Sequence, residues 1–352
     1  MRVLSFLIAY FFCSAAWADC EKTHIVSAGD TIFTIAEQYY RDRQKWTVIY
    51  YGNQDKLGGA LLQFPEGAEI NIPCLPSDQA ADATPLRQVD AEMKLLTESN
   101  YAPFTDHNWS GDGMITEIVN AALENSPYPV PYEIRWDDDW STHLFPQLDS
   151  KEFDMGFPWF RPNCEEDRLN QRCENFHFSE PLVELLILLF TRKDASFQFE
   201  TDSDITGKRL CRPKGYFTHD LERKGRDWIN QGIITLVQAN SPDACFDLLM
   251  KGEIDAVAVN EFLGWTKVSS LGLKGVVEPL RRPLSIEGLH VVISKKHWRG
   301  TTHLYRFNSG LEELKKSKRY DDIVSRHLGL FWAQLELWRF LKLHLDGRVW
   351  HQ

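Results

Sequence analysis

Apolar and polar residues form two different patterns along the chain. In residues 20–75, a short alternating stretch at each end flanks two segments with helical spacing, the first of which begins at Ile32. This order predicts a small β-α-α-β unit. From Met93 onward, apolar strand-like runs alternate with amphipathic helical segments, which is typical of an α/β fold with a mainly parallel sheet. The scheme repeats after Lys208, so we expect two α/β lobes.

Two segments lie outside these patterns. Residues 76–92 contain Pro, Ser, Asp and Ala without a sustained period, so we interpret them as a linker that lets the following domain move independently. Residues 331–352 carry apolar residues at helical spacing and predict a C-terminal helical extension. Such a helix either packs on its own domain or binds a membrane surface or a partner. We favour packing on the domain.

Residues 1–18 have the features of a secretory signal peptide, with a basic Arg2, a short apolar run and small residues before Ala18. The apolar run is shorter than the roughly 20 residues that a membrane-spanning helix needs. We therefore expect cleavage after Ala18 and a periplasmic location. The chain of 352 residues has a formal charge of −11, which argues against nucleic acid as a partner because phosphate binding needs a basic surface.

The sequence contains seven cysteines, and cleavage after residue 18 leaves six. An even number in an exported protein favours disulfides, and no C-x-x-C pair with zinc-site spacing is present. We therefore predict no metal and no cofactor. The distribution of the cysteines along the chain suggests three local pairs, namely Cys20–Cys74, Cys164–Cys173 and Cys211–Cys245.

Three motifs follow one another in residues 20–75: V-x-x-G-D-T-I-x-x-I-A from Val26, W-x-x-I-x-x-x-N from Trp46 and I-x-I-P from Ile70. In this order they resemble a LysM domain. The resemblance implies binding to peptidoglycan or another glycan that contains N-acetylglucosamine, in a groove with residues 55–62 on one side. The same positions also suit an ordinary turn and helix cap. The residues that the resemblance assigns to the other side of the groove are Gly29, Asp30, Thr31 and Ile32.

A second ordered set of motifs covers residues 93–330. It includes Y-x-P-F from Tyr101, F-S-E-P from Phe178 and L-x-x-G-x-x-D-A-V from Leu249. Together these resemble family 3 of the periplasmic solute-binding proteins, the polar amino acid type. The resemblance implies a two-lobed periplasmic-binding-protein fold of type II that closes on a small molecule. The expected lobe boundaries are about 93–190 and 290–330 for lobe 1 and about 193–288 for lobe 2.

The predicted cleft departs from the family at several positions. Arg172 has the family spacing for an arginine that binds a carboxylate, whereas Arg161 follows directly on a strand end; we leave both open. Either guanidinium suits a carboxylate or phosphate, because it donates two parallel hydrogen bonds. Phe104 is also a candidate for the core. The complete set of predicted ligand-binding residues is Tyr101, Phe104, Trp109, Trp159, Phe160, Arg161, Arg172, Lys214, Gly215, Tyr216, Asn260 and Glu261.

These features lead to one main hypothesis and two alternatives. The main hypothesis is a monomeric, peptidoglycan-tethered solute-binding protein that holds a small anionic or amino-acid-like ligand for an ABC transporter permease or a sensor. The first alternative is a peptidoglycan-associated enzyme on the same fold, of the lytic transglycosylase or dehydratase type. The second is a docking protein with a degenerate pocket. We identify no catalytic residues, because no nucleophile–base pair or carboxylate pair stands out in the sequence.

Overall fold

The structure is a computed structural model that describes residues 22–53, 56, 64–73, 91–166 and 169–346. The predicted signal peptide, residues 1–18, lies outside the described residues. So do Cys20, Cys74 and nearly all of the predicted linker.

The N-terminal unit is built from two strands and two helices in the order that the sequence predicts. The strands pair antiparallel, with Ile25 opposite Glu69. Thr31 caps the first helix, because its Oγ1 accepts a hydrogen bond from the backbone N–H of Thr34 at 3.1 Å. Apolar residues of both helices and of the second strand form the core of the unit. The elements are β1 (Lys22–Ile25), α1 (Ile32–Tyr40), α2 (Trp46–Tyr51) and β2 (Glu69–Ile72).

A mixed ten-stranded sheet runs through the rest of the described chain. Its main path has the order β4-β3-β5-β12-β7-β10-β8-β9, while β6 pairs with β12 and β11 pairs with β7. The strands are β3 (Met93–Thr97), β4 (Tyr132–Trp136), β5 (Met155–Phe160), β6 (Phe176–Phe178), β7 (Val183–Arg192), β8 (Arg209–Cys211), β9 (Thr235–Val237), β10 (Ala256–Asn260), β11 (Val277–Pro279) and β12 (Ser285–Ser294).

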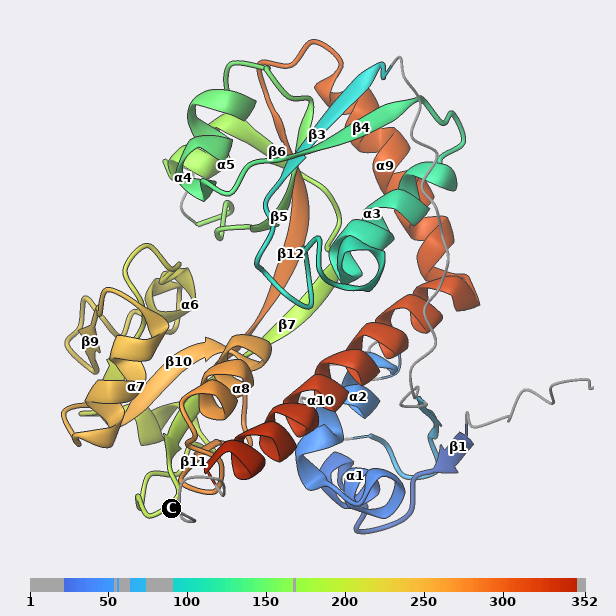
Figure 1. Cartoon of the computed structure of the whole chain (residues 1–352). Helices are drawn as coiled ribbons and strands as arrows, with labels where there is room; N and C mark the ends of the chain where they lie inside the picture. The colour runs from blue at the N-terminus through green and yellow to red at the C-terminus, as the bar shows by residue number, and fades with distance from the viewer. Residues whose placement is uncertain (1–21, 54–55, 57–63, 74–90, 167–168, 347–352) are drawn as a thin grey trace, which may run out of the picture.

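Helices cover this sheet in two groups, which separate the two lobes in Figure 1. Lobe 1 carries α3, α4, α5 and α9, and lobe 2 carries α6, α7 and α8, while α10 extends from α9 past α8. The helices are α3 (Met114–Glu124), α4 (Trp140–Thr142), α5 (Gln171–Asn175), α6 (His219–Glu222), α7 (Pro242–Met250), α8 (Glu261–Ser270), α9 (Gly300–Lys315) and α10 (Lys318–Asp346). The two-lobed α/β fold predicted from the sequence is confirmed.

Two long antiparallel strands connect the lobes. The first half of β7, Val183 to Ile187, pairs with Leu289 to Ser285 of β12. The second half of β7 pairs with β10 in lobe 2, and the second half of β12 pairs with β5 and β6 in lobe 1. The stretch where β7 and β12 pair with each other is therefore the hinge between the lobes.

Two of the three expected disulfides lie within the described residues, and both are confirmed. Cys164–Cys173 closes the loop between β5 and α5. Cys211–Cys245 joins the end of β8 to α7. The loop closed by the first bridge stands beside the opening between the lobes, so the disulfide limits its movement there.

Residues 331–346 of the C-terminal extension belong to α10. Phe331, Trp332 and Leu335 are buried, and the rings of Phe331 and Trp332 lie against Phe262 and Trp265 of α8. This part of the extension therefore packs on its own domain, as we favoured. None of the helices in the described part of the chain has the length and apolarity required to cross a membrane.

The N-terminal unit is docked on the back of the hinge, which differs from the independent movement that we expected. Tyr51 of α2 donates a hydrogen bond to Glu261 of α8 and accepts one from the backbone N–H of Leu186 in β7 at 3.2 Å. The Tyr51 ring also lies 6.0 Å from that of Phe262. Figure 1 shows α2 beside α10, and the buried core is continuous from the unit into both lobes.

Candidate functional site

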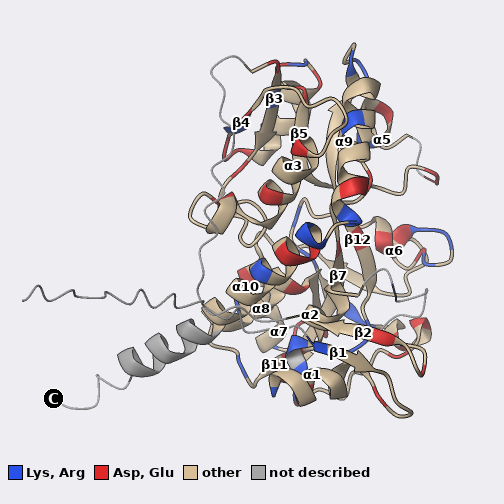
Figure 2. Cartoon of the chain, turned by 90° about the vertical axis from the view of Figure 1, so that its right-hand side faces the viewer, with Lys and Arg blue, Asp and Glu red and all other residues tan. Residues whose placement is uncertain are grey.

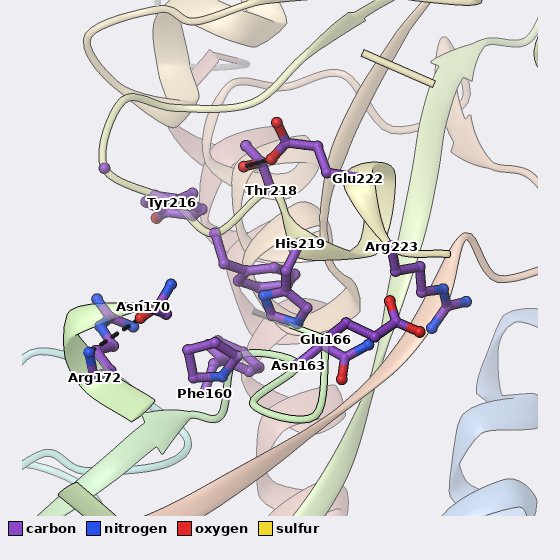
Figure 3. A pocket seen from close by; sticks show the side chains of 13 residues that line it. Phe160, Asn163, Glu166, Asn170, Arg172, Tyr216, Thr218, His219, Glu222 and Arg223 are labelled. Carbon is purple, nitrogen blue, oxygen red and sulfur yellow. Dashed lines mark hydrogen bonds between the residues drawn. The ribbon is translucent and has the colours of Figure 1, made fainter. Parts of the chain in front are cut away.

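A cavity of about 510 Å³ opens between the lobes on the side away from the N-terminal unit. Its volume falls in the range of small-molecule sites. Lobe 1 contributes the end of β5 and the disulfide-closed loop, and lobe 2 contributes the segment around α6. Figure 3 shows Arg172 and Asn170 at one end of the lining, Arg223 and Glu166 toward the other, and Phe160 and His219 between them.

The structure brings four of the predicted ligand-binding residues into this cavity: Phe160, Arg172, Gly215 and Tyr216. Phe160 lies at the end of β5, where ligands of open α/β sheets gather. Tyr216 remains 38% exposed at the rim, so its ring is available to a ligand.

Three other predicted residues contact other parts of the protein and do not line the cavity, so their assignment to the ligand site is corrected. Phe104 is fully buried, and its ring packs against Tyr101 and Phe262 in the core. Trp109 donates its indole N–H to Nδ1 of His327 in α10 at 2.9 Å. Glu261, the first residue of α8, is 1% exposed and faces Tyr51 of the N-terminal unit.

Tyr101 and Asn260 bond to each other rather than line the cavity. The Asn260 side chain also accepts a hydrogen bond from Leu263 N at 3.0 Å and caps α8. Burial raises the pKa of Tyr101, and the neighbouring Tyr216 raises it further. Both side chains are therefore already used by contacts within the protein.

The remaining three predicted residues lie outside the lining. Arg161 and Lys214 are exposed. Trp159 lies under the guanidinium of Arg172, with Cζ of Arg172 5.2 Å from the ring centroid, so it supports a cavity residue without lining the cavity itself. Arg172, not Arg161, is thus the arginine that the structure brings to the cavity.

Arg172 has no acidic partner among the described residues. Burial lowers the pKa of its guanidinium, but an arginine stays protonated at any physiological pH. Of the cations in the lining, Arg223 also forms no ion pair within the described part of the chain. A desolvated cation without a counter-charge favours an anion at that place, because burying an unpaired charge is costly.

Aromatic rings form the middle of the cavity. Phe160 of lobe 1 lies 4.8 Å from Phe217 of lobe 2, and Phe217 stacks on His219 at 4.7 Å. The first of these contacts joins the two lobes. They present an apolar surface to the flat or aliphatic part of a ligand.

A buried ion pair holds the lobe 2 side of the cavity in place. Arg212 and Asp220 are 1% and 0% exposed, and the guanidinium contacts both carboxylate oxygens, at 2.6 and 3.0 Å. Burial on its own raises the pKa of Asp220, but Arg212 more than offsets this, so the pKa lies below its usual value. His219 is oriented separately by Glu287 of β12, with Nε2 2.9 Å from Oε2.

The two ends of the cavity differ in charge. Glu166 and Glu222 lie in the same part of the lining as Arg223, whereas the described lining residues beside Arg172 are uncharged. Oε2 of Glu166 accepts a hydrogen bond from the backbone N–H of Lys224 at 2.8 Å, which joins the lobes across the cavity. The arrangement suits a ligand with an anionic group at Arg172 and hydrogen-bond donors at the other end.

Sequence reasoning missed most of the polar lining. The segment Thr218 to Arg223 forms only a single helical turn, so it has no periodicity that would mark it. The signal that could have located the rest was the insertion between Cys164 and Cys173, which places Glu166 and Asn170 beside the cavity. The lining residues that are absent from the predicted set are Pro162, Asn163, Glu166, Asn170, Phe217, Thr218, His219, Glu222 and Arg223.

Within the described residues, Asp154, His297 and His303 bring ligand-type atoms within 4.8 Å of one another. Nε2 of His297 is 2.7 Å from the Asp154 carboxylate, and its Nδ1 accepts a hydrogen bond from the backbone N–H of Arg299. Both ring nitrogens of His297 therefore already have protein partners, and the acceptor role of Nδ1 places the ring proton on Nε2. We interpret the group as a structural contact, because a metal ligand needs a free nitrogen lone pair.

The predicted glycan-binding residues lie at the start of α1. Gly29 and Thr31 are exposed there. Asp30 accepts hydrogen bonds from the His24 ring at 2.9 Å and from Ser27 N at 2.8 Å. Ile32 is fully buried in the core of the unit, so its assignment to the glycan surface is corrected. The opposite side of the expected groove, residues 55–62, lies outside the described residues apart from Lys56.

Charge is distributed over the whole molecule. Lys and Arg are interspersed with Asp and Glu over both lobes and the N-terminal unit in the view of Figure 2. The unpaired Arg172 therefore stands out by its desolvation in the cavity and not by belonging to a basic surface.

The fold is that of the two-lobed periplasmic binding proteins. The GluR0 ligand-binding core in complex with L-glutamate is similar with a TM-score of 0.51 and 18% identity, over 68% of this chain and 100% of that chain. The periplasmic VFT2 domain of Bordetella pertussis BvgS gives a TM-score of 0.50 and 17% identity, over 66% and 92%. At these identities the likeness shows the fold alone. No protein-family model matches the sequence, and no curated protein matches it significantly.

Proposed function

We propose that this chain is a periplasmic solute-binding protein without catalytic activity, which holds a small anionic or amino-acid-like ligand between its lobes. The GluR0 core, a ligand-binding domain of this fold, was solved with an amino acid that carries two carboxylates, which supports a carboxylate ligand. Two disulfides within the described residues support an oxidising compartment such as the periplasm. The ligand-bound protein is recognised by an ABC transporter permease or by a sensor protein.

The observation that carries this proposal is the guanidinium of Arg172 in the interlobe cavity, which has no ion-pair partner among the described residues. It is held over Trp159 and faces an opening lined by the aromatic rings of both lobes. The ligand places a carboxylate on Arg172 and its apolar part along Phe160 and Phe217. Its donor groups point toward Glu166 and Glu222. An arginine supplies two parallel hydrogen bonds to a carboxylate, which a single ammonium does not.

A thermal-shift screen of the full mature chain against acidic amino acids, dipeptides, muropeptides and organic acids tests the proposal. We expect at least one anion to raise the melting temperature, because a ligand that binds only the folded state stabilises it. Arg172→Ala abolishes the shift. Arg161→Ala removes a neighbouring cation outside the cavity and leaves the shift unchanged. No shift with any compound in the unmodified chain would favour a docking protein with a degenerate pocket.

We further propose that the N-terminal unit is a LysM domain that attaches the receptor to peptidoglycan. Its β-α-α-β order and the exposed start of α1 at Gly29 and Thr31 support this proposal. Because the unit packs on the hinge, its removal would expose Phe262 and confuse the result. A point substitution in the full chain is therefore the better test.

Pull-down with insoluble peptidoglycan compares three full-length chains. The unmodified protein sediments with the polymer, and Thr31→Arg abolishes this because a long side chain fills the proposed contact surface. Gln38→Arg adds the same charge on an exposed position of the same helix and leaves binding intact. Equal binding by Thr31→Arg and Gln38→Arg would place the glycan elsewhere. Soluble muropeptides released during incubation would instead indicate the lytic enzyme.

A further inference from the structure

Helix α10 is anchored to lobe 1 through α3. Arg319 forms an ion pair with Glu124 at 2.8 Å. About two turns further on, Arg326 and His327 both contact Glu117, with Nε2 of His327 2.9 Å from the carboxylate. His327 is fully buried, and Trp109 bonds to its other ring nitrogen. The first half of the helix is therefore fixed to lobe 1 by contacts on several consecutive turns.

The same helix is anchored to lobe 2 by its following turns. The Phe331 ring lies 5.0 Å from Phe262, and the Trp332 ring lies 5.9 Å from Trp265. The Lys274 ammonium donates to the backbone carbonyl of Leu335 at 2.7 Å. From Arg319 to Leu335 the helix rises about 24 Å, so a single rigid element spans the distance between the lobes.

The N-terminal unit adds a second contact across the same side. Tyr51 touches α8 of lobe 2 through Glu261 and touches the hinge strand β7 through the N–H of Leu186. The α2 helix, which carries Tyr51, also packs on α10. Rotation of one lobe about the hinge would therefore separate contacts in at least two places.

We propose that α10 and the N-terminal unit brace the back of the hinge and fix the angle between the lobes, so that the cavity keeps one shape with or without ligand. This differs from closure of the lobes on a ligand, which the family resemblance implies. On the cavity side, the Phe160–Phe217 contact and the Lys224–Glu166 hydrogen bond also join the two lobes. The inference rests on the interlobe contacts and is independent of which ligand binds.

Distance measurements by double electron–electron resonance test the brace in the full mature chain. Spin-labelled unnatural side chains replace Glu174 in lobe 1 and Asn230 in lobe 2, which are both exposed. These labels leave the native cysteines untouched. For the unmodified brace we expect one narrow distance distribution without ligand. A broad or two-peaked distribution would overturn the proposal, because it would show that the lobes already move.

Variants of the brace supply the second half of the test. In the doubly labelled chain, Phe331→Ala with Trp332→Ala broadens the distribution at least twofold, whereas Trp298→Ala, at an exposed position outside the brace, leaves it narrow. If the double variant does not fold, Lys274→Ala with Tyr51→Phe removes the hydrogen bond to the Leu335 carbonyl and both hydrogen bonds of the Tyr51 hydroxyl. This variant is expected to broaden the distribution to a smaller degree. A distribution that stays narrow in a folded brace variant would overturn the proposal.

Discussion

The two sides of the hinge are built from different kinds of contact. On the back, the rings of Tyr51, Phe262 and Phe331 are buried together, and the Tyr51 hydroxyl is hydrogen-bonded to Glu261 and to the backbone N–H of Leu186. On the front, Arg172 and Tyr216 line an open cavity, and Arg172 has no acidic partner among the described residues. Burial and satisfied polar groups serve stability, whereas an unpaired charge beside exposed rings serves recognition. This difference supports our proposal that the ligand binds on the front.

The largest expected difference concerns stability. Phe262→Ala removes a ring that contacts the N-terminal unit, the core of lobe 1 and α10, and we expect it to lower the free energy of unfolding by about 3–5 kcal/mol. Tyr216→Ala on the front is expected to cost less than about 1 kcal/mol, because the ring is partly exposed. Urea denaturation measures both. Equal losses would contradict the distinction between the two sides.

A second difference appears in the pH dependence of stability on the back of the hinge. Burial raises the pKa of Glu261 to about 8, from a usual value of 4.5. The folded protein therefore holds a proton on Glu261 that the unfolded chain loses above pH 4.5. The contribution of Glu261 to the free energy of unfolding is therefore complete below about pH 4.5 and is lost as the pH rises to about 8.

Glu261→Gln removes this titration but keeps an oxygen that accepts from Tyr51. The melting temperature of the variant, relative to that of the unmodified protein, is expected to increase between pH 5 and pH 8. Identical pH profiles for the two proteins would mean that Glu261 is ionised in the folded state, and the buried contact with Tyr51 would need another explanation.

A smaller effect of the opposite sign is expected where α10 meets lobe 1. Burial opposes ionisation of Glu117, but hydrogen bonds from His327 and Arg326 outweigh it and lower the pKa of Glu117 to about 2. The contribution of Glu117 to the free energy of unfolding is therefore present above pH 4.5 and is lost as the pH falls toward 2. Glu117→Gln should cost about 1 kcal/mol at pH 7, measured by urea denaturation, and much less at pH 3. An equal cost at both pH values would contradict this.

The fold was predictable because it follows from patterns that extend over many residues. The alternation of strands and helices after Met93 and the ordered motifs together indicate two lobes, and the spacing of Cys164 and Cys173 suggests a local bridge. Each of these signals comes from residues that are close to one another in the sequence. The N-terminal helices were predictable for the same reason, since Thr31 and Ile32 mark a helix start.

The docking of the N-terminal unit was not predictable from these signals. Tyr51 and Phe262 each fit the pattern of a core residue within their own unit, so nothing in the sequence indicates that they meet. The family resemblance placed Glu261 in the cleft, but this first residue of α8 faces Tyr51 of the N-terminal unit. Contacts between distant segments depend on side-chain direction, which spacing along the chain does not specify.

Native mass spectrometry of the protein isolated from the periplasm in which it is made tests most directly whether the front cavity binds an anion through Arg172. We predict that the unmodified protein and Arg161→Ala carry the additional mass of a small acidic molecule, and that Arg172→Ala is recovered without it. The absence of any bound mass from the unmodified protein, or the same mass on Arg172→Ala, would contradict the assignment of this cavity as the ligand site.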